Sequence, residues 1–176
     1  VGDDFSEDFK SLLRNKGIDL AGLEVKQGQK SFFWKGRYHT DLNNRDTLDT
    51  QLNVLADFDP KVPDQYKTAE FLMLGNLMPS IQQKVIAQMT KRPKLIVLDT
   101  MNFWMDIALD DLKKTLTMVD VLTINDSEAR QLAGEYSLVK AAQKILDMGP
   151  KVLIIKKGEH GALLFNREQV FFAPAL

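Results

Sequence analysis

Three short polar segments contain the residue types that bind a phosphate group and a divalent cation. They are Asp99, Asn125 with Glu128, and residues 156–161. Carboxylate and amide oxygens are ligands that suit Mg²⁺, which keeps several of its own waters. The ammonium group of Lys156 and the backbone N–H groups of a turn with Gly158 and Gly161 can bind phosphate oxygens. The residue types therefore indicate a phosphate and metal site, provided that the fold brings the segments together.

Four continuous apolar runs predict the strands that would position these segments. The runs cover residues 71–74, 95–98, 121–124 and 152–155. They begin roughly 25–30 residues apart, which leaves room for one helix and two loops between parallel strands. Runs without polar alternation are typical of strands that are covered on both faces. Because ligands of an open parallel sheet bind beyond the carboxyl ends of its strands, we expect the three polar segments along one edge.

Apolar residues at helical spacing predict helices between these strands. The stripes are Ile81, Val85 and Met89 after Pro79, then Leu109, Leu112 and Leu116, then Leu138, Ala142, Ile145 and Leu146 after Ser137. Proline suits the first position of a helix, and Gly149-Pro150 ends the last one. A further helix is expected from about residue 6 to residue 16, ended by Gly17. Alternating strands and helices predict an α/β fold with a mainly parallel sheet and right-handed crossovers.

Two segments with period-two hydrophobicity predict antiparallel hairpins. In the first, residues 31–54, a polar loop from His39 to Asp46 separates two apolar faces. These faces are formed by Phe32, Trp34 and Tyr38, and by Leu48, Leu52 and Val54. The aromatic face is either ordinary core packing or a cover over a ligand. The second hairpin is expected around Asn166-Arg167-Glu168, between residues 161–165 and 169–173.

Each polar segment also has a purely structural interpretation. Asn125 with Glu128 three residues later has the pattern of a helix capping box, which is compatible with metal binding. Residues 156–161 can form a tight turn with solvated lysines. Asp99 can contact a metal, a ribose or the N-terminus of a helix. The sequence contains neither a Walker A loop nor a G-x-G-x-x-G motif, so the two common nucleotide-binding loops are excluded.

The composition narrows the classes of protein. The 176 residues suffice for one domain with its own core, and a net charge of −1 argues against nucleic-acid or membrane-surface partners, since both require a clustered basic excess. No apolar stretch approaches the roughly 20 residues that span a bilayer. The absence of cysteine excludes disulfides and thiolate metal sites and makes the cytoplasm the expected location. His39 and His160 show no metal-ligand spacing.

Taken in order, these segments resemble the PfkB/ribokinase family of carbohydrate kinases over essentially the whole chain. Residues 1–5 followed by 16–19 are similar to the family's VG-D-x-G and GI/V-D stretch. Residues 125–134 resemble its N-x-x-E-x-x-x-L-x-G signature, and residues 149–162 resemble its G-x-x-x-V-x-x-T-x-G-x-x-G stretch. The last two signatures, in this order and at this spacing, are far more specific together than either alone.

The resemblance implies a ribokinase-like three-layer αβα fold with a mainly parallel sheet and a small antiparallel lid. Residues 1–30 and 55–176 would form part of the α/β domain, and residues 31–54 would form the lid hairpin. The implied activity is ATP-dependent phosphoryl transfer to a sugar hydroxymethyl group, with ATP and Mg²⁺ as cofactors. A nucleoside kinase of the same family, acting on a compound such as adenosine, is the alternative substrate class. The exposed aromatic hairpin is also compatible with a homodimer contact.

The resemblance also implies roles for individual residues. Asn125 and Glu128 would hold the metal and its phosphates, Lys156 and Gly158 would contact the nucleotide phosphates, and Gly161 would permit the turn. Asp99 also falls at the nucleotide edge. Two positions depart from the family pattern, since Asp99 stands where many members have asparagine and Lys156 replaces a small hydroxyl residue.

The family's catalytic base is the aspartate of a G-A-G-D motif, and this sequence contains no such motif. The family also has a strand and a glycine-rich substrate-binding region before the stretch that resembles residues 1–5. We therefore expect no catalytic base among these 176 residues, and no significant kinase activity from them alone. A non-catalytic binding or regulatory module of kinase ancestry is the alternative from another functional class, and it predicts that the whole gene lacks the G-A-G-D motif.

Overall fold

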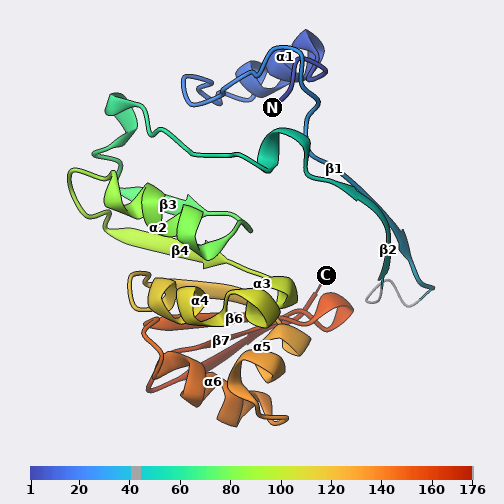
Figure 1. The fold of residues 1–176 in the computed structure, drawn as a ribbon. Coiled ribbons are helices and arrows are strands. Elements are labelled where there is room, and N and C mark those ends of the chain that lie inside the picture. Colours follow the sequence, from blue (N-terminus) through green and yellow to red (C-terminus); the bar gives the residue numbers. More distant parts are fainter. Residues whose placement is uncertain (41–44, 176) are drawn as a thin grey trace. The chain divides into compact units, whose positions relative to one another are not determined.

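The computed structural model describes residues 1–40 and 45–175 and divides the chain into two compact units, Val1–Pro63 and Asp64–Leu176. The first unit contains the N-terminal helix and the hairpin that was expected as a lid. The second unit contains every residue that the sequence singled out as a candidate ligand. Figure 1 shows the helices and strands of each unit.

The first unit consists of α1 (Glu7–Asn15), β1 (Phe33–Tyr38), β2 (Arg45–Gln51) and a 3₁₀ turn, Asn53–Leu55. The helix forms where the apolar stripe predicted it, and Gly17 follows it with a φ of 75° that favours glycine. Near the N-terminus, Asp4 accepts hydrogen bonds from both the backbone N–H and the hydroxyl of Ser31, at 2.8 and 2.7 Å. These bonds join the start of the chain to the entry of the hairpin.

The hairpin contains a β-bulge that the alternating pattern did not predict. The strands pair antiparallel, but the register shifts between Lys35 and Gly36, and Leu48 of β2 has no partner in the pairing. A bulge interrupts the alternation of side chains along a strand. Since Leu52 lies beyond the strand and Val54 lies in the 3₁₀ turn, the prediction that these residues share a strand face with Leu48 is wrong. Residues 41–44 of the predicted polar loop lie outside the described residues.

The second unit is built on a six-stranded sheet in the order β3-β4-β5-β6-β7-β8. Its strands are β3 (Phe71–Leu74), β4 (Leu95–Asp99), β5 (Val121–Asn125), β6 (Val152–Lys156), β7 (Ala162–Phe165) and β8 (Val170–Ala173). The first four are parallel, and β6, β7 and β8 pair antiparallel. The four predicted parallel strands and the C-terminal hairpin are therefore confirmed.

Five helices and two further 3₁₀ turns complete this unit. They are α2 (Pro79–Ala87), α3 (Asn102–Ile107), α4 (Leu109–Leu116), α5 (Asp126–Ala133), α6 (Leu138–Leu146), and the turns Asp64–Tyr66 and Gly158–His160. The sequence did not predict α3, and the stripe assigned to α2 is wrong at Met89, which lies beyond the end of the helix. In the described part of the chain, the helices fall short of the length and apolarity that a membrane span requires.

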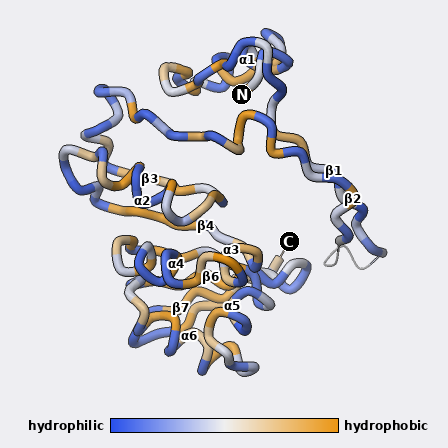
Figure 2. Tube along the Cα trace, in the orientation of Figure 1, coloured by the Kyte–Doolittle hydropathy of each residue, from blue (hydrophilic) through white to orange (hydrophobic). Residues whose placement is uncertain are grey.

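One face of the sheet shares a single hydrophobic core with α2–α6 (Figures 1 and 2). Six strand residues of this core occupy alternate positions and are fully buried: Ile96, Leu98, Leu122, Ile124, Leu153 and Ile155. Side chains alternate between the faces of a strand, so all six lie on the face that the helices cover. Burial of each side chain contributes about 1.5–3 kcal/mol. This core therefore fixes the register of the strands that end in the candidate ligands.

The opposite face of the sheet is less covered within the described residues of the second unit. Val97, Thr123 and Ile154 lie on this face and are only partly buried. The sequence predicted that both faces of the sheet are covered. Within this unit, helices cover one face, and the other is only partly buried. Each of the three residues on this less covered face is followed two positions later by a candidate ligand at the strand end: Asp99, Asn125 and Lys156, respectively. Residues two apart in a strand point to the same face, so the three candidate side chains lie on the same side of the sheet.

Asp120 joins the amino ends of three strands. Its backbone N–H donates to the Ile96 carbonyl, and its own carbonyl accepts from the N–H groups of Lys151 and Val152. Its carboxylate accepts from the Ile96 N–H at 3.0 Å, from Arg92 at 3.1 Å and from Lys151 Nζ at 3.0 Å. Burial raises the pKa of Asp120, but the hydrogen bonds from Lys151, Ile96 and Arg92 together lower it below its usual value.

Candidate functional site

The three polar segments lie along the carboxyl edge of the parallel strands. Asp99 is the last residue of β4, and its neighbour in β5 is Thr123. Asn125 is the last residue of β5, and its neighbour in β6 is Lys156. The predicted convergence of the strand ends is therefore observed, while the ligands assigned to them remain a prediction.

Lys156 and Asp99 form an ion pair across β5. Nζ of Lys156 lies 3.1 Å from Oδ1 of Asp99. Neighbouring strands are about 4.8 Å apart, so about 10 Å separate β4 from β6, and the lysine side chain must lie over β5 to reach the carboxylate. The side chains are 51% and 26% exposed, so the pair is accessible to a ligand. The sequence placed both residues at the nucleotide edge but did not predict their contact.

Asn125 and Glu128 form a complete capping box at the start of α5. The Glu128 N–H donates to Asn125 Oδ1 at 2.8 Å, and the Asn125 N–H donates to Glu128 Oε2 at 2.7 Å. The structural interpretation of this pair is therefore correct. It does not exclude the chemical one, because a carboxylate has room for about four hydrogen bonds and a metal can be contacted through water. The cap holds a nearly buried carboxylate at the edge of the sheet.

Residues 157–161 form a tight turn after β6. The Lys157 N–H donates to the Gly161 carbonyl at 2.8 Å, and the Gly161 N–H donates to the Gly158 carbonyl at 3.1 Å. A β-carbon on Gly161 would lie 2.0 Å from the carbonyl oxygen of Ala173, so only glycine fits where the chain after β8 passes this turn. Because its amide is engaged within the turn, Gly161 shapes the loop, and a direct phosphate contact would fall to Gly158.

Gln82 and Thr100 are buried polar residues near this edge that the sequence analysis missed. The Gln82 side-chain amide donates to the carbonyls of Gly75, at 2.8 Å, and Asp99, at 3.1 Å, and so ties the ends of β3 and β4 together. Gln82 Oε1 and Thr100 Oγ1 are buried without a hydrogen-bond partner among the described residues. The sequence feature that could have indicated Gln82 is its position three residues after Pro79, on the buried side of a predicted helix.

The residues at this edge fit a magnesium ion that keeps water ligands. Among the residues that the structure describes, no group of three or more His, Cys, Asp or Glu side chains is arranged to hold a metal. Glu128 and Asn125 supply oxygens that can reach a hydrated ion through water. Mg²⁺ commonly takes its other ligands from substrate phosphates and water. The donor set therefore fits a magnesium–polyphosphate complex and not a dedicated protein cage.

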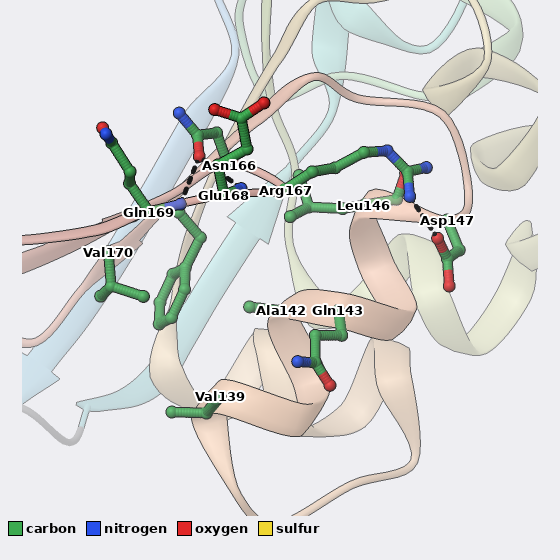
Figure 3. A pocket seen from close by; sticks show the side chains of 11 residues that line it. Val139, Ala142, Gln143, Leu146, Asp147, Asn166, Arg167, Glu168, Gln169 and Val170 are labelled. Carbon is green, nitrogen blue, oxygen red and sulfur yellow. Dashed lines mark hydrogen bonds and ion pairs between the residues drawn. The ribbon is translucent and has the colours of Figure 1, made fainter.

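A cavity of about 440 Å³ lies elsewhere in the second unit, between α6 and the turn that joins β7 to β8 (Figure 3). Phe165, which lines it, is the neighbour of Leu153 near the start of β6, so this turn is at the opposite edge of the sheet. Arg167 reaches from the turn to Asp147 at 2.9 Å. None of the candidate site residues lines this cavity, and it carries no argument for phosphate chemistry.

Comparison with known protein families matches the whole chain. Residues 1–176 match the family described as pfkB family carbohydrate kinase. The chain belongs to this family. The resemblance drawn from the sequence is therefore confirmed, and the family supports a phosphotransferase.

Individual relatives show how much of a family member the chain represents. A cytidine kinase of Thermococcus kodakarensis is 21% identical over 169 residues, covering 94% of this chain and 59% of the relative. The Burkholderia thailandensis nucleoside kinase in complex with inosine matches with a TM-score of 0.75 and 16% identity, covering 100% of this chain and 57% of that one. A candidate ribokinase II from E. coli in complex with ATP and Mg²⁺ matches with a TM-score of 0.77 and 18% identity, covering 100% and 60%.

These matches confirm the ribokinase-like α/β fold, with its mostly parallel sheet and its separate antiparallel hairpin. The chain spans about three fifths of the length of these relatives. At such low identity, the ligands in those structures belong to the relatives.

Proposed function

We propose that the protein containing this chain is an ATP- and Mg²⁺-dependent kinase that phosphorylates an alcohol group of a sugar or nucleoside. The supporting observation is that Asp99, Asn125 and Lys156 end neighbouring parallel strands at one edge, in a chain that belongs to the pfkB family. The reaction breaks the bond between the γ-phosphorus of ATP and its bridging oxygen and forms a bond to the acceptor oxygen. ADP leaves, and the acceptor proton passes to a general base.

The residues of this chain would position the polyphosphate and balance its charge. Lys156 donates to phosphate oxygens through its ammonium group, and Gly158 offers its backbone in the turn after β6. Glu128, with Asn125, would orient the water ligands of the metal through the oxygens that the capping box holds at the edge. A magnesium ion held there through water would supply positive charge that offsets the negative charge of the polyphosphate. The general base belongs to the G-A-G-D motif of the family, which is not in this sequence, so we expect no turnover from these 176 residues alone.

A sugar hydroxymethyl group is our first choice of acceptor, and a nucleoside is the second candidate. The observation that favours a nucleoside is the aromatic face of β1, where Trp34 and Tyr38 lie on the same side of the strand and are both exposed. Such rings can stack on a base. The named relatives comprise two nucleoside kinases and one ribokinase-type protein, and their low identity to this chain does not decide between the two acceptor classes.

The test is a phosphorylation assay of the full-length protein with ribose, fructose, adenosine and cytidine as acceptors and Mg·ATP as donor. Release of ADP that depends on one of the sugars supports the first choice, and dependence on a nucleoside supports the second. No turnover with any acceptor, together with a gene that lacks the G-A-G-D motif, would identify a non-catalytic module and refute the proposal.

A Glu128→Gln variant tests the site itself. Glutamine retains an oxygen that can accept from the Asn125 N–H, so the cap survives while the negative charge is lost. We expect the KM for Mg·ATP to rise about tenfold with little change in the KM for the acceptor. Asp126→Asn is the matched control, because Asp126 lies in the same first turn and pairs with Arg130 at 2.6 Å. If Glu128→Gln turns over normally at all Mg²⁺ concentrations, Glu128 only caps α5 and has no role in metal binding.

A further inference from the structure

We propose that Asp99 is a positioning residue, whose carboxylate holds the ammonium group of Lys156 over β5 at the point where a polyphosphate would bind. The inference rests on the proposed function, because it assigns a partner to Lys156 within the same site. It differs from the roles that the sequence left open for Asp99, which were a direct contact with a metal, with a ribose or with the N-terminus of a helix.

The path of the Lys156 side chain carries this inference. Lys156 ends β6, yet its ammonium group lies beside a carboxylate of β4, at 3.1 Å. Without a partner on β4, a lysine that is 51% exposed would sample many conformations and would extend into solvent. The pair instead places the cation near the middle of the edge, above the strand that ends in Asn125.

The main chain of Asp99, which carries the carboxylate that pairs with Lys156, is itself restrained. The main-chain carbonyl of Asp99 accepts a hydrogen bond from Gln82, a residue that is 1% exposed. The same amide group donates to Gly75 at the end of β3. The hydrogen bonds of Gln82 and the ion pair between Asp99 and Lys156 therefore link β3, β4 and β6 along the carboxyl edge.

The charges of the pair determine how substitutions should combine. An ammonium group has three donors, so Lys156 can bond to Asp99 and to phosphate oxygens at the same time. Removal of Lys156 alone leaves the Asp99 carboxylate facing the phosphates, where it repels them. Removal of both charges leaves a neutral edge. The effects of the two substitutions on nucleotide binding therefore cannot be independent.

The test is a double-mutant cycle in the full-length protein, with ATP affinity measured by calorimetry and kcat measured with the best acceptor. We expect Lys156→Met to weaken ATP binding about tenfold or more. In that background, Asp99→Asn should restore about threefold or more of the affinity, because it removes the repulsion. In the wild-type background, Asp99→Asn should change the affinity less than about threefold and lower kcat about fivefold, because the cation is no longer held in place.

Lys151→Met is the matched control. Lys151 precedes the same strand, β6, and pairs with Asp120 at 3.0 Å at the opposite edge of the sheet. The same substitution there should leave ATP affinity within about twofold of wild type. Circular dichroism and urea midpoints establish folding of each variant, and Lys156→Gln provides a second neutral replacement.

The outcomes separate this inference from the proposed function. If Asp99→Asn changes ATP affinity by the same factor with and without Lys156, Asp99 does not act through Lys156, and the inference is overturned while the kinase proposal stands. If the wild-type protein does not bind ATP, both are overturned. Recovery of affinity in the double variant, with a lowered kcat for Asp99→Asn alone, supports the positioning role.

Discussion

Replacing Asp120 by asparagine tests whether one buried carboxylate ties together the amino ends of β4, β5 and β6. The Asp120 side chain is only 5% exposed, and three groups donate to it: the Ile96 N–H, Arg92 and Lys151. Asparagine has nearly the same shape and keeps one oxygen for the Ile96 N–H. The substitution therefore removes the charge and leaves the packing almost unchanged.

The expected loss follows from the exposure of the partners. A buried hydrogen bond to a charged group contributes about 1.5–3 kcal/mol and a neutral one about 0.5–1.5 kcal/mol, so the bond to Ile96 weakens by about 1 kcal/mol. Arg92 and Lys151 are 55% and 77% exposed, so solvent screens them and each contributes about 0.2–1 kcal/mol. The sum is about 2 kcal/mol for Asp120→Asn. Asp120→Ala also leaves the buried Ile96 N–H without its acceptor, which costs about 1–2 kcal/mol more, so a loss of about 3–4 kcal/mol is expected.

Urea unfolding followed by circular dichroism measures this loss, and its pH dependence tests the mechanism. The folded-state pKa of Asp120 lies below its usual value, because the hydrogen bonds from Lys151, Ile96 and Arg92 outweigh the effect of burial. The stabilisation is therefore complete above the unfolded-state pKa, near 3.9, and is lost as the pH falls through the folded-state pKa. The difference between wild type and Asp120→Asn should be about 2 kcal/mol at pH 7 and should shrink below about pH 4.

The exposed pair between Glu70 and Lys94 provides the control. It joins the segments before β3 and β4 at 2.7 Å, with side chains 56% and 66% exposed. Glu70→Gln should cost less than about 0.5 kcal/mol. Equal urea midpoints for wild type and Asp120→Asn at pH 7, or a difference that grows in acid, would refute the account of Asp120.

Three further substitutions test the fold around the site. Gly161→Ala should cost about 2 kcal/mol or more in urea unfolding, because its β-carbon would meet Ala173, whereas Gly17→Ala, with open space around it, should cost about 1 kcal/mol. Gln82→Met should cost about 2 kcal/mol, because two carbonyls lose their buried donor. Leu122→Ala should cost about 2–5 kcal/mol, as for other fully buried leucines. Loss of less than about 0.5 kcal/mol in any of these three site variants would contradict its assigned contact.

Local sequence patterns were sufficient for most of the secondary structure. The runs at 71–74 and 152–155 became strands with nearly those bounds. Alternate side chains such as Leu74, Leu153 and Ile155 enter the core, whereas Phe71 and Met73 lie on the other face and stay exposed. The stripe at Leu109, Leu112 and Leu116 became α4 because residues three and four apart share one face of a helix. The bulge at Leu48 could not be predicted, since alternation describes an ideal strand and contains no information on where pairing slips.

At the carboxyl edge too, the sequence predicted some features and only the tertiary structure showed the others. The sequence alone determined which residues end the strands, because Asp99, Asn125 and Lys156 each follow an apolar run, and it determined the capping box, whose two members are three residues apart. Only the tertiary structure decided that Lys156 contacts Asp99, 57 residues away, and that the Gln82 amide donates to the main-chain carbonyl of Asp99. Such contacts depend on strand order and register, which are set by the packing of the whole core and not by any local segment.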